Sequence, residues 1–144
     1  MADTKVAEVM ARDAALRTAP DTPVRAASAR MAEHRCGSIL VMSGDRLVGI
    51  FTERDALFRV VAGGLDPSTT RVADVMTRDP DTIDAEAPVT EALRKMDQFS
   101  YWHLPVTRDG AVVGVVSIRD LPFGGGSALQ DELDTRHRLA ERML

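Results

Sequence analysis

Two stretches of the chain carry apolar residues at the spacing of a helix face. Asp21-Thr22-Pro23 opens the first, with a capping residue and a proline suited to the first helical position, and Ala87-Pro88 opens the second. The apolar positions that share each face are Val24, Ala27 and Met31, and then Val89, Ala92, Leu93 and Met96. The pattern predicts two amphipathic helices, the first of about three turns and the second ending by Ser100.

Each of these helices is followed by two short apolar runs with a turn between them. The runs are residues 38–42 and 46–51 in the first half and residues 103–107 and 111–116 in the second half. Ser43-Gly44-Asp45 and Arg108-Asp109-Gly110 have the composition of hairpin turns. A further helix is expected directly after Phe51 and directly after Val116. The sequence therefore predicts an α+β fold, in which helices cover small sheets of short strands.

The same order of elements occurs twice because the chain contains a tandem duplication. VAEVMARD at 6–13 returns as VADVMTRD at 72–79, and GIFTERD at 49–55 returns as GVVSIRD at 114–120. We place the first repeat at residues 1–66, the second at residues 67–123, and a Gly-rich linker with a C-terminal amphipathic helix at residues 124–144. Repeats of about sixty residues bury little surface alone, so the pair is expected to fold as one body about a pseudo-twofold axis.

The repeated seven-residue motif places a hydroxyl at the end of a strand and an aspartate three residues later. Its copies are Thr52-x-x-Asp55 and Ser117-x-x-Asp120. This is the spacing of a helix capping box. It also suits a ligand, because a helix start offers N–H groups to a phosphate and a carboxylate accepts hydrogen bonds from a ribose diol. Arg54 and Arg119 add a cation for phosphate oxygens, and since a cap needs neither this arginine nor the leading glycine, the repetition favours a ligand site. The two roles are compatible.

With these motifs the chain resembles the tandem cystathionine-β-synthase (CBS) domain pair, a regulatory module that binds adenosine-containing ligands. The resemblance runs from residue 6 to about residue 122 and rests on VAEVM and VADVM, on the GSILV and HLPV strands, and on the twin motifs. It implies that the hydroxyl and aspartate of each motif hold the ribose and phosphate of an adenosine ligand, in one of two clefts between the repeats. It also implies flat, side-by-side homodimers.

The resemblance assigns residues of this chain to each cleft. One cleft would contain Thr52, Arg54 and Asp55 for ribose and phosphate, with Thr82 and the backbone near Tyr101 and Trp102 facing the base. The other would contain Ser117, Arg119 and Asp120, with His103 on the phosphate side and Cys36 and Gly37 near the base. Arg17 stands where its repeat partner is Thr82, so the two clefts differ chemically. Trp102 would either stack on the adenine or fill the cleft, and Pro122 would cut short the helix after the second motif.

Composition narrows the class of protein and its compartment. The chain is 44% hydrophobic and 28% charged with a net charge of −4, which is typical of a soluble globular protein and argues against general affinity for nucleic acid. One cysteine, Cys36, excludes an internal disulfide framework. MADTKVAEV lacks the apolar core of a signal peptide or a membrane span. A cytoplasmic protein with no membrane or nucleic-acid partner is expected.

Residue patterns typical of catalysis and of metal sites do not emerge from the sequence. His34, His103 and His137 stand singly, without a cysteine at ligand spacing, and no metal is expected. The glycines at 124–126 lack the lysine and hydroxyl of a phosphate loop, and no nucleophile is paired with a base, so no enzyme is expected.

The sequence thus predicts a regulatory sensor of an adenosine ligand such as AMP, ADP or ATP, which forms a homodimer and modulates a separate effector protein. One alternative is a ligand-free oligomerisation or interaction module whose twin motifs act as helix caps. A less favoured alternative is an enzyme acting on a nucleotide. The motifs would grip the adenosine that AMP, ATP, S-adenosylmethionine and dinucleotides share, so the sequence does not discriminate among these ligands.

Overall fold

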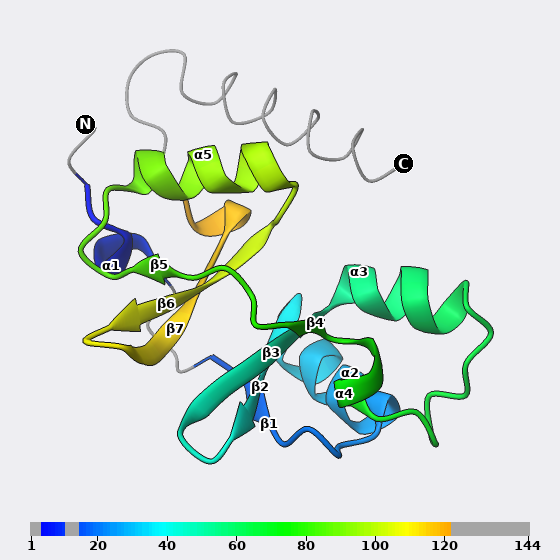
Figure 1. Cartoon of the computed structure of the whole chain (residues 1–144). Coiled ribbons are helices and arrows are strands. Elements are labelled where there is room, and N and C mark those ends of the chain that lie inside the picture. The colour runs from blue at the N-terminus through cyan, green and yellow to red at the C-terminus, as the bar shows by residue number, and fades with distance from the viewer. Residues whose placement is uncertain (1–3, 11–14, 122–144) are drawn as a thin grey trace. The chain divides into compact units, whose positions relative to one another are not determined.

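The computed structural model describes residues 4–10 and 15–121 (Figure 1). Its described residues form two compact units. The first unit contains residues 15–80, and the second unit contains residues 4–10 and 81–121. The predicted linker and helix at 124–144, and Pro122, lie outside the described residues. No helix in the described part of the chain is long and apolar enough to cross a membrane.

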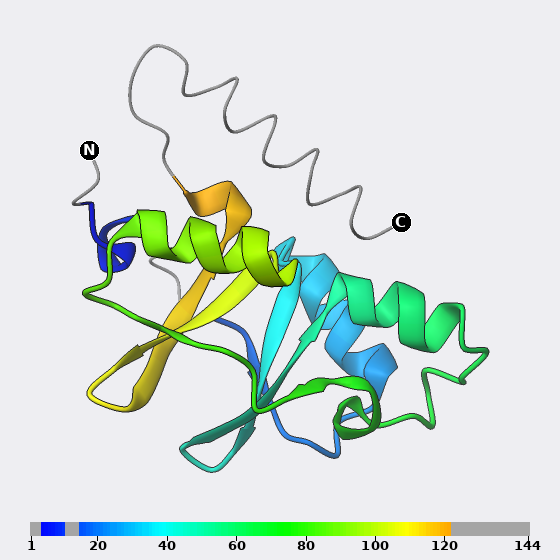
Figure 2. The same cartoon turned by 45° about the horizontal axis from the view of Figure 1, so that its top comes forward.

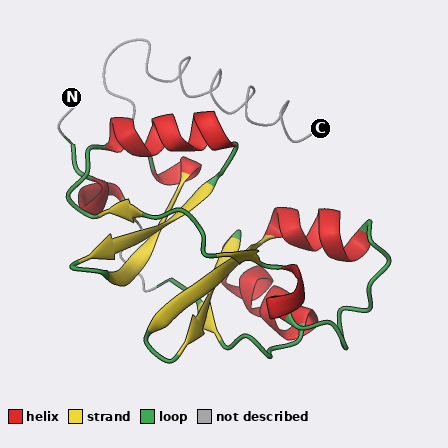
Figure 3. Ribbon diagram, in the orientation of Figure 1, coloured by secondary structure: helices red, strands yellow, loops and turns green. Residues whose placement is uncertain are grey.

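The first unit is a four-stranded sheet with helices packed beside it (Figure 3). The strands are β1 (Arg17–Thr18), β2 (Ser38–Ser43), β3 (Arg46–Thr52) and β4 (Thr77–Arg78), in that order across the sheet. Strand β1 runs parallel to β2, and the other pairs are antiparallel. The helices are α2 (Val24–His34), α3 (Glu53–Asp55), which continues as a π-helical segment over Ala56–Val61, and α4 (Val72–Val75).

The second unit repeats this plan with a three-stranded sheet. Its strands are β5 (Ile83–Asp84), β6 (His103–Arg108) and β7 (Ala111–Ser117), with β5 parallel to β6 and β6 antiparallel to β7. Its helices are α1 (Val6–Val9), α5 (Val89–Phe99) and a single 3₁₀ turn, Ile118–Asp120. Helix α5 packs beside β6 of its own sheet (Figure 2). The α+β fold and the paired hairpins predicted from the sequence are confirmed.

Both amphipathic helices bury the face that their apolar spacing predicts. In α2 the buried residues are Val24, Ala27 and Met31. In α5 they are Val89, Ala92 and Met96, with Leu93 partly buried against them. Each helix packs into the core of its own unit, beside Phe51 in the first and Leu104 in the second.

The predicted start of α2 is wrong by one position. Pro23 is the N-cap rather than the first helical residue, and no side chain caps the helix. Backbone carbonyls cap it instead: the Val24 amide donates to the carbonyl of Thr70 at 2.8 Å and the Arg25 amide to that of Pro67 at 2.9 Å. Because these acceptors are distant in the sequence, no local pattern could indicate them.

The segments that open each sequence repeat pack in an exchanged fashion. Val6 N donates to Ala87 O at 2.8 Å, so α1 belongs to the second unit, whereas Val72 N donates to Thr22 O at 2.9 Å, so α4 belongs to the first. The structural units are therefore divided differently from the sequence repeats 1–66 and 67–123, whose bounds remain sequence predictions.

The exchange explains the leading glycine of each seven-residue motif. A Cβ atom at Gly49 would collide with the Met76 side chain, and one at Gly114 would lie 3.2 Å from Met10 Sδ. Met76 and Met10 close the two copies of the VADVM/VAEVM motif. These glycines thus admit a methionine against the strand, and their repetition is explained by packing, without a ligand.

Candidate functional site

The two motifs occupy the same place in their respective units. Thr52 ends β3 and is the N-cap of α3, and Ser117 ends β7 and is the N-cap of the 3₁₀ turn. Their backbones agree closely, with φ and ψ of −120° and 166° at Thr52 and of −109° and 165° at Ser117. The helical segments that follow differ in length. Nine residues follow Thr52 and three follow Ser117, so the helix expected after Val116 is a single turn within the described residues.

Each aspartate folds back onto the hydroxyl residue of its motif. The Thr52 amide and hydroxyl both donate to Asp55 Oδ2, at 2.9 and 3.1 Å, and the Asp55 amide donates to Thr52 Oγ1 at 3.2 Å. In the second unit the Ser117 amide and hydroxyl donate to Asp120 Oδ2 at 2.8 and 3.1 Å. The predicted capping spacing is therefore realised in both motifs.

Asp55 is the more enclosed of the two carboxylates. Its side chain is 9% exposed, and Arg59 Nε lies 3.5 Å from Oδ1. Burial raises the pKa of Asp55, while the hydrogen bond from Thr52 and the positive charge of Arg59 act in the opposite direction. Sequence reasoning missed Arg59, although its position four residues after Asp55 is the spacing of a helical ion pair.

Asp120 lies in a more open environment. Its side chain is half-buried, and within residues 4–10 and 15–121 its hydrogen bonds come from Ser117 and end on Oδ2. Arg119 beside it is exposed. The second carboxylate oxygen, Oδ1, is the group with which this motif could accept a further hydrogen bond.

His103 flanks the second motif, since it pairs with Ser117 across the hairpin. Burial, with the positive charge of Arg119, lowers the pKa of His103 to about 4, so the imidazole is neutral at neutral pH. The equivalent neighbour of Thr52 is Ser38, which is buried. The two motifs therefore differ in the side chain that borders them.

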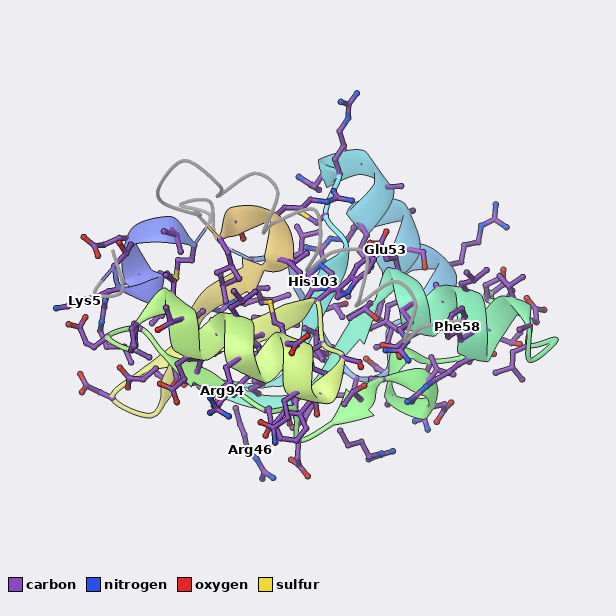
Figure 4. All side chains as sticks on the ribbon, turned by 90° about the horizontal axis from the view of Figure 1, so that it is seen from above. Lys5, Arg46, Glu53, Phe58, Arg94 and His103 are labelled. Atoms are coloured by element: carbon purple, nitrogen blue, oxygen red, sulfur yellow. The ribbon has the colours of Figure 1, made fainter. Side chains whose placement is uncertain are left out.

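Arg54 does not extend freely into solvent. Its guanidinium lies over the ring of Phe58, 5.5 Å from the ring centroid, and both residues belong to the helical segment that follows Thr52. Glu53 and Phe58 of this segment are both labelled in Figure 4. A cation–π contact of this kind holds the guanidinium near the helix surface.

The remaining predicted residues lie near the start of β2 or of β6, or directly before β5. Gly37 O accepts from the Glu53 amide at 3.0 Å, and Trp102 O accepts from the Ile118 amide at 2.9 Å. Cys36 is exposed. Thr82 O accepts from Lys95 Nζ at 2.8 Å, and Tyr101 stacks on Phe99 with centroids 5.9 Å apart.

The structure thus brings the site residues together in two sets, one in each unit. The first unit holds Cys36, Gly37, Thr52, Arg54 and Asp55. The second unit holds Thr82, Tyr101, Trp102, His103, Ser117, Arg119 and Asp120. The predicted clefts combine residues of both units, and this pairing stays a prediction. No group of three metal-ligating side chains occurs among the described residues.

A duplicated α+β unit with the same strand-end hydroxyl and carboxylate in both copies defines the class of protein as a tandem-repeat module. The family model for the CBS domain matches residues 6–62 and 72–121. The chain belongs to the CBS domain family, and it is a tandem CBS pair, a regulatory module.

Curated relatives and solved structures agree with this assignment. The chain is 40% identical to the CBS domain-containing protein CBSCBSPB1 of Arabidopsis thaliana over 104 aligned residues. The alignment covers 72% of the chain and 19% of the relative. It is 31% identical to a putative signal-transduction protein with CBS domains from Burkholderia ambifaria, with a TM-score of 0.76. The superposition covers 81% of this chain and 90% of the Burkholderia chain. A CBS domain protein of Pyrobaculum aerophilum, solved in complex with AMP, is 27% identical, with a TM-score of 0.76 and coverage of 91% and 99%.

The chain is short compared with its plant relatives. It spans between 19% and 24% of the length of five Arabidopsis CBS proteins. By contrast it covers 90% of a Bacillus subtilis relative, the uncharacterized protein YlbB, to which it is 32% identical.

Proposed function

We propose that this CBS pair is a sensor that binds an adenosine ligand such as AMP, ADP or ATP and thereby alters its contacts with an effector protein. In this proposal the protein acts in the cytoplasm as a homodimer and does not itself catalyse a reaction. A ligand can shift such contacts only if it binds one conformation more tightly than another.

One observation carries the proposal: each motif fixes a carboxylate at a strand end through one oxygen. In the second unit the amide and hydroxyl of Ser117 hold Asp120 Oδ2. Oδ1 then has a fixed direction and can accept a hydrogen bond from a ribose hydroxyl. The cap and the ligand site are thus compatible uses of one carboxylate. The AMP complex of the Pyrobaculum relative supports adenosine as the ligand class.

The capping geometry also supports the second candidate, a ligand-free interaction module. In that case the hydrogen bonds of Thr52 with Asp55 and of Ser117 with Asp120 would be the whole purpose of the motifs. The packing of Gly49 and Gly114 against methionines also supports this alternative, because it explains the repeated glycine without a ligand.

Titration calorimetry of the full chain with AMP, ATP, S-adenosylmethionine and NAD distinguishes the two candidates. The sensor predicts saturable binding of at least one of these ligands, with the ligand recovered unchanged after incubation. Absence of binding by all four would favour the interaction module. Turnover of a bound nucleotide would instead support an enzyme.

A further inference from the structure

We infer that the two motifs have separate roles: Asp120 is the carboxylate that binds the adenosine ligand, whereas Arg59 holds Asp55 in a structural tie. The ligand half of this inference rests on the proposed function, and the half about Arg59 does not.

Arg59 ties three parts of the first unit together. Its Nε lies 3.5 Å from Asp55 Oδ1, and its Nη1 donates to the carbonyls of Val75 at 3.2 Å and Met76 at 3.1 Å. These carbonyls lie at the C-terminal end of α4, where helix carbonyls lack partners within the helix. We call this group of Arg59, Asp55 and the two carbonyls the Arg59 clasp.

The clasp occupies the groups with which Asp55 would bind a ligand. Oδ2 accepts from the amide and hydroxyl of Thr52, and Oδ1 faces Arg59. The side chain is 9% exposed, so a ribose hydroxyl could reach it only if the surrounding residues moved. The neighbouring cation of the motif, Arg54, lies over Phe58.

The second repeat cannot form the same clasp. The position four residues after Asp120 is Gly124, which has no side chain. Within the described residues Asp120 accepts hydrogen bonds only through Oδ2, and it stays half-buried beside an exposed Arg119. His103 borders this motif, where the first unit has the buried Ser38. Of the two motifs, the second therefore has an imidazole beside its carboxylate and cation, where the first has a serine.

The first arm of the test measures the clasp without any nucleotide. Arg59→Met is made in the wild-type chain and in an Asp55→Asn chain, because asparagine keeps an oxygen for the cap but loses the charge. Arg59→Met is expected to lower Tm by roughly 2 to 6 °C in the wild type and by clearly less in the Asp55→Asn chain. Equal decreases in both chains would overturn the clasp. Arg46→Met is the control, because Arg46 is exposed at the start of β3 and its charge is not among those that shift the pKa of Asp55; its effect should not depend on Asp55→Asn.

The second arm titrates AMP into the full chain and into single variants. We expect one AMP per chain, at least tenfold weaker binding in Asp120→Asn, and less than a twofold change in Asp55→Asn and in Arg59→Met. Loss of binding in Asp55→Asn alone, or two AMP per chain, would overturn the inference while the sensor function stands. If the wild type binds none of AMP, ATP, S-adenosylmethionine and NAD, the proposed function and the ligand half both fail, and the first arm still decides the clasp.

Discussion

At the residue scale, Gly49 and Gly114 show how one sequence feature can have two explanations. Repetition of this glycine suggested a ligand site, but its position against Met76 and Met10 gives it a packing role. The sequence could not reveal this, because each methionine comes from the segment that opens the other repeat. The hydroxyl and aspartate spacing, by contrast, correctly predicted the caps, since a capping box is a local structure.

Replacement of these glycines should destabilise the protein unequally. Gly49→Ala places a Cβ against Met76 in a buried position and should lower the free energy of unfolding by about 1 to 3 kcal/mol. Gly114→Ala should have a smaller effect, because Met10 is only partly buried and can move. Denaturant unfolding measures both. Met76→Ala should restore part of the loss in Gly49→Ala, and a double variant no more stable than Gly49→Ala would contradict this explanation.

His103 should make stability depend on pH. Its pKa is about 4 in the folded protein and near 6.5 when unfolded, so the unfolded chain binds the proton more readily. The stability contribution is present above pH 6.5 and is lost as pH falls toward 4, by on the order of 2 kcal/mol because the ring is only partly buried. The lowered pKa values of Asp74 and Glu86 act below their ordinary values of 3.8 and 4.5, largely outside this window. The raised pKa of Asp55 acts above 3.8 and has the opposite sign, because its contribution to stability is lost as pH rises.

Unfolding curves between pH 4.5 and 7.5 test this prediction. His103→Gln should flatten the profile, whereas His34→Gln, at an exposed position of α2, should leave it unchanged. A profile that keeps its slope in His103→Gln would show that another group is responsible.

At the element scale, the exchange of α1 and α4 decides which helix stabilises which sheet. The apolar pattern predicted α2, α5 and both hairpins, because each is encoded within a few residues. It did not predict the partners of VAEVM and VADVM. The hydrogen bonds of these segments, to Ala87 and to Thr22 respectively, join residues that are far apart in the chain. Non-local pairing of this kind leaves no periodic pattern.

Two matched substitutions test the exchange. Val6 and Val72 occupy equivalent positions and are both 0% exposed. Val6→Ala and Val72→Ala should each lower stability by about 1 to 3 kcal/mol. Hydrogen exchange should then accelerate mainly in β5, β6 and β7 for Val6→Ala, and mainly in β2 and β3 for Val72→Ala. The reverse assignment, with Val6→Ala affecting β2 and β3, would contradict the exchange.

At the scale of the whole molecule, the sequence and the structure agree that this is a tandem CBS pair. The sequence predicted two clefts that differ through Arg17 and Thr82. The side chains also make the two motifs unequal, because Arg59 has a glycine as its counterpart and His103 has a serine. A single-residue comparison of the repeats would have shown both differences, but only the structure places Arg59 on Asp55.

The most direct test of the account is an AMP titration of the wild type and of the double variant Asp55→Asn/Asp120→Asn, with melting curves of both. Asparagine keeps a cap acceptor at each motif, so Tm should change by only a few degrees. We expect the wild type to bind AMP and the folded double variant to bind it at least tenfold more weakly. Equal binding by both proteins would contradict the claim that a motif carboxylate holds the adenosine ligand, and no binding by the wild type would contradict AMP as that ligand.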